Sequence, residues 1–121
     1  MDPRFVDHFK NPRNVGELDD PHGRAALENP VCGDQIEVWV RIEDGAVSAL
    51  SYRVLGCSGA IAAASVMSEL VLGKPLEDAL ALTPEAVDEA LGGLPTLKQH
   101  GADLAVDGLR TALRDTVKET P

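Results

Sequence analysis

The chain has 121 residues, 44% of them hydrophobic and 3% aromatic, which predicts one globular domain over residues 1–121 with a largely aliphatic core. Its 20 acidic residues against 11 Lys and Arg give a formal net charge of −9, which disfavours nucleic-acid phosphate as a partner. No stretch resembles a membrane span or a signal peptide, so we expect a cytoplasmic protein without membrane contact. In a reducing compartment two cysteines favour free thiols or metal ligands over a disulfide.

Short elements separated by loops are predicted in the first part of the chain. A helix is expected over residues 3–10, where apolar side chains recur at helical spacing until Asn11-Pro12. Residues 23–28 predict a weak first strand. Residues 35–42 alternate apolar and polar side chains, which is typical of a half-buried strand.

A third strand is expected over residues 47–55, joined to the second by a hairpin. A two-residue loop would place Val38 opposite Ser51. A three-residue loop places Val38 opposite Tyr52 and keeps apolar side chains together on one face. The second register is the one expected, with a bulged turn near Gly45.

Helices are predicted for the second half of the chain. The alanine-rich run over residues 59–72 ends at a glycine, and two shorter helical segments are expected over 74–82 and 83–92. A long helix is expected over residues 97–117, and its two internal glycines call for a packing or site reason. These elements predict a small α+β domain.

Both cysteines lie at boundaries between predicted elements. Cys32 and Asp34 flank Gly33 just before a strand, and Cys57 begins a helix, where the helix dipole favours a thiolate. Together with His100 they would offer two sulfurs, a carboxylate and an imidazole to a soft or borderline metal. The alternatives are a small buried residue at Cys57, a turn around Cys32 and a half-buried histidine at His100.

Four motifs extend over nearly the whole chain. They are Val6-Asp7-His8-Phe9-Lys10-Asn11-Pro12-Arg13-Asn14-Val15-Gly16, Asn29-Pro30-Val31-Cys32-Gly33-Asp34, Gly56-Cys57-Ser58-Gly59-Ala60-Ile61-Ala62 and Leu94-Pro95-Thr96-Leu97-Lys98-Gln99-His100. In this order they resemble the signatures of the IscU/NifU-type iron-sulfur cluster assembly scaffolds.

The resemblance implies a SufE/NifU-like fold, in which helices pack on one face of a three-stranded antiparallel sheet and the last helix is long. It implies a non-enzymatic scaffold that binds iron, accepts sulfur from a cysteine desulfurase, builds a 2Fe-2S cluster and passes it to apo iron-sulfur proteins. Cys32, Asp34, Cys57 and His100 match the metal-ligand positions, and Cys32 and Cys57 are the candidates for accepting persulfide.

The segment Leu94, Pro95, Thr96, Leu97 and Lys98 resembles the family's recognition site for an Hsp70-type chaperone and its co-chaperone. Thr96 and Leu97 stand where that site has proline and valine, which weakens this inference.

Gly101 departs from the family pattern, because members usually carry a third cysteine directly after the histidine. Asp34 is therefore expected to serve as a ligand in place of the missing thiolate. The spacing from Cys57 to His100 leaves no room for the insertion of the SufU-like zinc-dependent sulfurtransferases. The alternatives to a cluster scaffold are a zinc-bound sulfur carrier and a regulatory paralogue that binds assembly partners without building a cluster.

Overall fold

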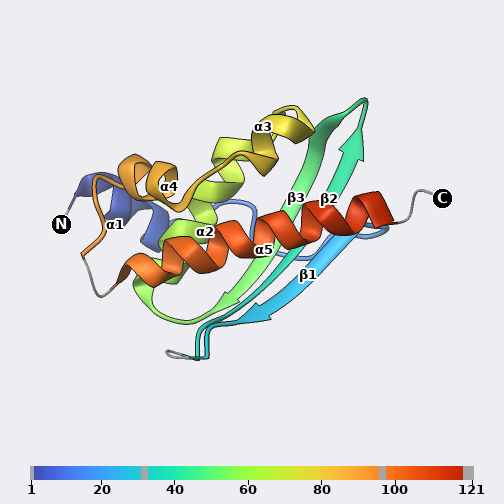
Figure 1. Ribbon diagram of the computed structural model, residues 1–121. Helices are drawn as coiled ribbons and strands as arrows, with labels where there is room; N and C mark the ends of the chain where they lie inside the picture. Colours follow the sequence, from blue (N-terminus) through green and yellow to red (C-terminus); the bar gives the residue numbers. More distant parts are fainter. Residues whose placement is uncertain (1, 31–32, 96–97, 119–121) are drawn as a thin grey trace.

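The computed structural model describes residues 2–30, 33–95 and 98–118. Its elements in chain order are α1 (Pro3–Lys10), β1 (Gly23–Glu28), β2 (Gln35–Glu43), β3 (Ala46–Leu55), α2 (Ser58–Val71), α3 (Leu76–Leu80), α4 (Pro84–Ala90) and α5 (Gln99–Lys118). Within the described residues the strands form one antiparallel sheet in the order β1-β2-β3. Helices α2 and α5 pack on the same face of this sheet (Figure 1), which confirms the predicted fold class.

The β2–β3 register confirms the expected pairing, with Val38 opposite Tyr52 and Ile36 opposite Val54. All of these side chains except the half-buried Val54 are less than 3% exposed, and they face the helices. Burial of one face fixes the register, because a shift by one residue would turn every apolar side chain toward solvent.

The predicted three-residue turn is wrong. Pairing continues to Glu43 and Ala46, so the loop consists of Asp44 and Gly45, whose φ angles of 53° and 75° are both positive, as a type I′ turn requires. The irregularity lies further along the hairpin, next to Arg41. A type I′ turn matches the twist of the strands, and the bulge beyond it produces the same apolar register.

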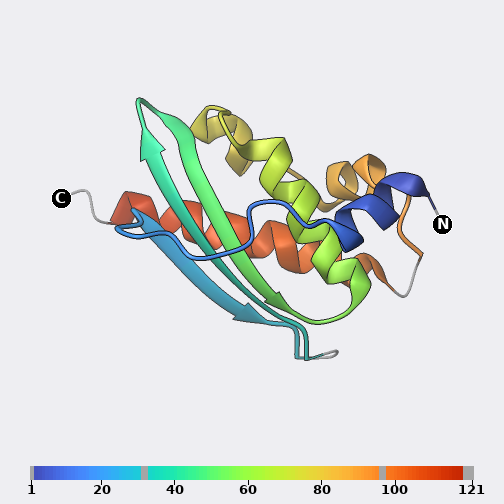
Figure 2. The same cartoon turned by 180° about the vertical axis from the view of Figure 1, so that it is seen from behind.

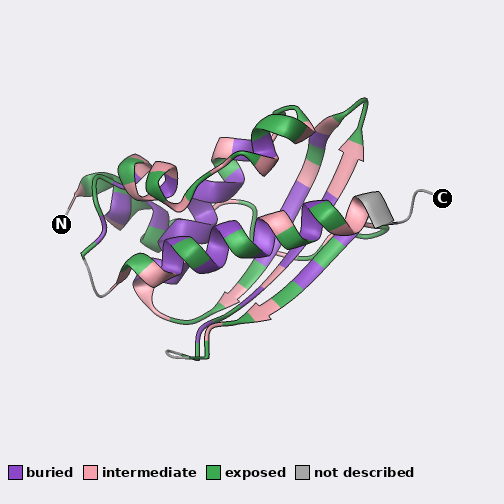
Figure 3. Cartoon of the chain, viewed as in Figure 1, coloured by how far each residue is buried: buried purple, intermediate pink, exposed green. Residues whose placement is uncertain are grey.

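The core between the sheet and the helices is aliphatic, as the composition predicts. Its fully buried side chains include Val38, Val40, Val47, Ala62, Ala63, Met67, Val106, Leu109 and Leu113. The buried positions run along α2 and along the side of α5 that faces the sheet (Figure 3). One internal glycine of α5 has its packing reason here, because a Cβ at Gly108 would lie 3.0 Å from the Cγ2 atom of Ile36.

The connection from α1 to β1 crosses the other face of the sheet (Figure 2). It is attached to β3 where the Gly16 amide donates to the Tyr52 carbonyl at 2.9 Å, and to β2 where the His22 amide donates to the Val40 carbonyl at 2.8 Å. Trp39, on this face of β2, is only 7% exposed.

No helix among the described residues is long and apolar enough to cross a membrane.

Helix α1 is fixed to the middle of α2 by a buried polar cluster. His8 Nδ1 lies 2.7 Å from Ser65 Oγ, which also accepts the Arg13 amide at 3.0 Å. On its other side, His8 Nε2 lies 3.3 Å from Glu69 Oε1. The first of the four sequence motifs therefore serves to dock the N-terminal helix.

Candidate metal centre

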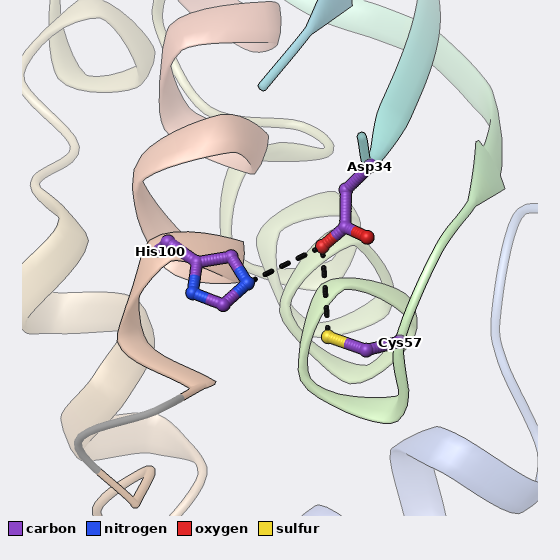
Figure 4. Close-up of side chains that lie close together, drawn as sticks. All are labelled: Asp34, Cys57 and His100. Carbon is purple, nitrogen blue, oxygen red and sulfur yellow. Dashed lines mark hydrogen bonds and ion pairs between the residues drawn. The ribbon is translucent and has the colours of Figure 1, made fainter. Parts of the chain in front are cut away.

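Three of the four predicted ligands meet at one end of the sheet (Figure 4). Asp34 directly precedes β2, Cys57 is the N-cap residue of α2, and His100 lies in the first turn of α5. Cys32, the fourth predicted ligand, lies outside the described residues. Three segments that are far apart in the sequence thus bring a carboxylate, a thiol and an imidazole together.

Backbone geometry fixes Asp34 at the start of β2. The Asn29 amide donates to the Asp34 carbonyl at 2.7 Å, and the Gly33 amide donates to the Asn29 carbonyl at 2.7 Å. Gly33 has a φ of 75°, a left-handed conformation that glycine adopts without a steric penalty. The loop that contains the first cysteine motif is therefore closed at its base, and Asp34 is held at that base.

The side chains converge on a single carboxylate oxygen. Cys57 Sγ lies 3.6 Å and His100 Nε2 lies 3.4 Å from Asp34 Oδ2, and the three ligand atoms all lie within 4.8 Å of one another. The Asp34 side chain is 8% exposed, whereas the His100 side chain is 28% exposed. The imidazole therefore lies on the solvent side of a buried carboxylate.

The two separations from Asp34 Oδ2 are close to those between ligands of one metal ion. With zinc-type bond lengths, tetrahedral coordination places sulfur and oxygen about 3.6 Å apart and nitrogen and oxygen about 3.4 Å apart. In the described part of the chain, the Asp34 carboxylate has two polar side-chain partners, the Cys57 thiol and the His100 imidazole. Burying a carboxylate with so little positive charge nearby is costly, and a cation would remove that cost.

Two glycines bring the three segments close together. A Cβ at Gly56 would lie 2.7 Å from the Asp34 carboxyl carbon, so the carboxylate rests against the backbone just before Cys57. A Cβ at Gly101 would lie 2.7 Å from the amide nitrogen of Ala60. This contact is the packing reason for the second internal glycine of α5.

The predicted chaperone-recognition segment is only partly described. Leu94 is buried and Pro95 is exposed, while Thr96 and Leu97 lie outside the described residues. The ammonium group of Lys98 donates to Ser58 Oγ and lies 5.7 Å from the centre of the Phe5 ring. Sequence reasoning missed this attachment of Lys98 to the start of α2, for which the run of small residues after Cys57 is the only signal.

This fold and this set of donor atoms define a small α+β protein with a site suited to a transition metal. The family model described as the NifU-like N terminal domain matches residues 2–120. The chain is 45% identical over 112 residues to the iron-sulfur cluster assembly scaffold protein IscU 1 of Archaeoglobus fulgidus, covering 93% of this chain and 73% of that protein. It is 40% identical over 114 residues to the IscU scaffold protein of Aquifex aeolicus, with coverage of 93% and 73%.

The fold is also that of a solved structure, the N-terminal part of a NifU-like protein from Brucella abortus. The TM-score is 0.79 at 20% identity, and the match covers 98% of this chain and 94% of that one. The chain belongs to the NifU-like N-terminal domain family and is a scaffold of the IscU/NifU type.

Proposed function

We propose that this protein assembles an iron-sulfur cluster of the 2Fe-2S type, with Asp34, Cys57 and His100 as ligands and Cys32 as a fourth. The observation that carries the proposal is the convergence of a buried carboxylate, a thiol and an imidazole within 4.8 Å. The relatives from Archaeoglobus fulgidus and Aquifex aeolicus, both named as cluster assembly scaffolds, support the same role.

The donor set suits a cluster that is to be given away. Thiolates are the usual ligands of iron-sulfur clusters, and an oxygen or nitrogen ligand in their place raises the reduction potential. Asp34 offers a hard oxygen and His100 a nitrogen, so Cys57 is the one sulfur donor of the described site. We therefore expect a cluster that is held weakly enough to be passed to apo iron-sulfur proteins.

Metal binding changes the protonation of the centre. The Cys57 thiol donates to Asp34 Oδ2, and it must lose this proton before the sulfur can bind a metal. His100 must present an unprotonated nitrogen to the same point. Uptake of the metal therefore removes the thiol proton from the centre.

Sulfur would arrive as a persulfide on a cysteine desulfurase. A thiolate of this chain attacks the outer sulfur atom, a new S–S bond forms, and the desulfurase thiolate leaves. Cys57 and Cys32 are the candidates for this step, and Cys57 is half-buried.

Anaerobic reconstitution with ferric iron and sulfide, followed by absorbance and Mössbauer spectroscopy, tests the proposal. The wild-type protein should take up a 2Fe-2S cluster, and His100→Ala should not retain it. The control is His22→Ala, because His22 accepts the Ile42 amide at 2.9 Å, away from the centre, and should leave cluster uptake unchanged. A wild-type protein that never forms the cluster overturns the proposal.

The second candidate function is a zinc-bound sulfur carrier or a regulatory paralogue. It is favoured by the convergence of the Cys57 thiol and the His100 imidazole on one carboxylate oxygen, at 3.6 and 3.4 Å, which suits a single metal ion. Metal analysis combined with a persulfide-transfer assay distinguishes these roles. Bound zinc with sulfur transfer from the desulfurase to the chain supports a carrier, and bound zinc without transfer supports the regulatory role.

A further inference from the structure

The first turns of α2 and α5 touch through their backbones. A Cβ at Gly101 would lie 2.7 Å from the Ala60 amide nitrogen, 2.8 Å from the Gly59 carbonyl carbon and 2.9 Å from the Ala60 Cα. All three are backbone atoms, so no side chain can rotate to make room. The two helices approach this closely only because position 101 carries no side chain.

Lys98, two residues before His100, makes a similar contact with α2. A Cβ at Gly59 would lie 2.8 Å from the Lys98 Cβ, and the Lys98 ammonium donates to Ser58 Oγ. Residues 98 and 101, which bracket His100, therefore both rest on the turn that follows Cys57. The contact between the two helices therefore lies on both sides of His100 in the sequence.

We infer that Gly101 is a positioning residue of the metal centre, which holds His100 Nε2 within reach of Asp34 and Cys57 through the contact of α5 with α2. The inference rests on the proposed function in one respect, that the centre binds a metal. An added methyl group needs about 1 Å more space to reach ordinary carbon contact distances. Binding sites tolerate displacements of only about 0.5 Å.

A cysteine at position 101 is therefore not a simple additional ligand in this chain. Its Cβ would meet the same backbone atoms of α2 as that of an alanine, so Gly101→Cys should separate the helices and move His100 away. We expect this variant to bind metal more weakly than the wild-type protein. The site is built for a glycine at this position.

Titration with Co²⁺, followed by its absorbance bands, tests this in the full chain. Gly101→Ala should lower the Co²⁺ affinity at least tenfold. The matched control is Gly108→Ala in the same helix, whose Cβ would meet only the side-chain methyl groups of Ile36 and Val38, at 3.0 and 3.2 Å. It should change the affinity less than twofold.

A second readout separates positioning from a general loss of structure. In the Co²⁺ form, the paramagnetically shifted imidazole N–H of His100 should be present in the wild-type protein and in Gly108→Ala, and absent in Gly101→Ala. A Gly101→Ala variant with wild-type affinity, or one that keeps this resonance, overturns the inference. So does a Gly101→Cys variant that binds Co²⁺ more tightly and shows stronger sulfur-to-cobalt charge transfer.

A gentler variant covers the case in which Gly101→Ala does not fold. Ser58→Ala removes the hydrogen bond from Lys98 without adding an atom, and it should lower the Co²⁺ affinity about threefold; an unchanged affinity contradicts positioning by this contact. If the wild-type protein binds no Co²⁺, this inference fails, whereas the proposed function is decided separately by cluster reconstitution. If the wild-type protein binds Co²⁺ and all variants bind equally, only the inference fails.

Discussion

Two histidine–carboxylate pairs in this protein have nearly the same separation and opposite burial. His100 Nε2 lies 3.4 Å from Asp34 Oδ2, and His8 Nε2 lies 3.3 Å from Glu69 Oε1. In the first pair the carboxylate is 8% exposed and the imidazole 28%, whereas in the second the imidazole is 9% exposed and the carboxylate 47%.

The difference in burial separates the proposed metal site from a structural contact. The Asp34 carboxylate is buried next to a thiol, where a cation would stabilise a negative charge. The Glu69 carboxylate is exposed to water, and buried His8 has Ser65 Oγ 2.7 Å from its other nitrogen. A histidine beside a carboxylate is therefore not by itself a sign of metal binding, and the group that is buried decides between the two roles.

The largest expected effect is at the metal-site pair. Asp34→Ala should abolish metal retention, lowering Co²⁺ affinity by at least about 100-fold, because loss of a direct ligand exceeds the 10–100-fold typical of outer-shell changes. Equilibrium dialysis with metal analysis measures it. The control is Asp7→Ala, an exposed carboxylate that pairs with Arg13 at 2.6 Å, and it should retain the metal. A cluster that becomes more stable in Asp34→Ala contradicts a ligand role for Asp34.

The next largest effect concerns the structural pair and appears in stability. His8→Ala removes a buried partner of Ser65 and leaves a cavity under α1, so it should lower the free energy of unfolding by about 2–3 kcal/mol. Urea unfolding of the metal-free protein measures this. Co²⁺ affinity should stay within twofold of wild type. A loss of metal binding with unchanged stability would reverse the roles assigned to the two pairs.

The smallest effect is a pH dependence of stability that comes from His8. Burial lowers the pKa of His8, and nearby Arg13 lowers it further. Because the folded pKa lies below the ordinary value of 6.5, neutral His8 stabilises the fold above pH 6.5, and this contribution is lost as pH falls toward the folded pKa. The free energy of unfolding of wild type minus that of His8→Gln should therefore shrink between pH 8 and pH 5. A difference that grows over this range contradicts the account.

Local patterns were sufficient to predict most of the fold. Apolar and polar residues alternate along β2, and pairing Val38 with Tyr52 keeps the apolar side chains of both strands on one face. This gave the correct register, because only one register buries all of these side chains together. The bulge was misplaced because it depends on distant residues. Val47 exchanges backbone hydrogen bonds with Gly73 and Lys74 on the loop after α2, and no sequence pattern near the turn reveals that contact.

The candidate site was less accessible to sequence reasoning. Residue types and element boundaries singled out Asp34 and Cys57, and the structure brings both to His100. The close packing of Gly101 could not be predicted, since helical spacing does not tell which backbone lies opposite a residue. The role of His8 was missed for the same reason, because its partners Ser65 and Glu69 lie more than 50 residues further along the chain.

The iron and acid-labile sulfide content of anaerobically purified protein tests the central claim most directly. A scaffold that holds a 2Fe-2S cluster at Asp34, Cys57 and His100 predicts iron and sulfide in equal amounts, both lost in His100→Ala. Stoichiometric zinc without sulfide, or neither iron nor sulfide after reconstitution, would contradict it.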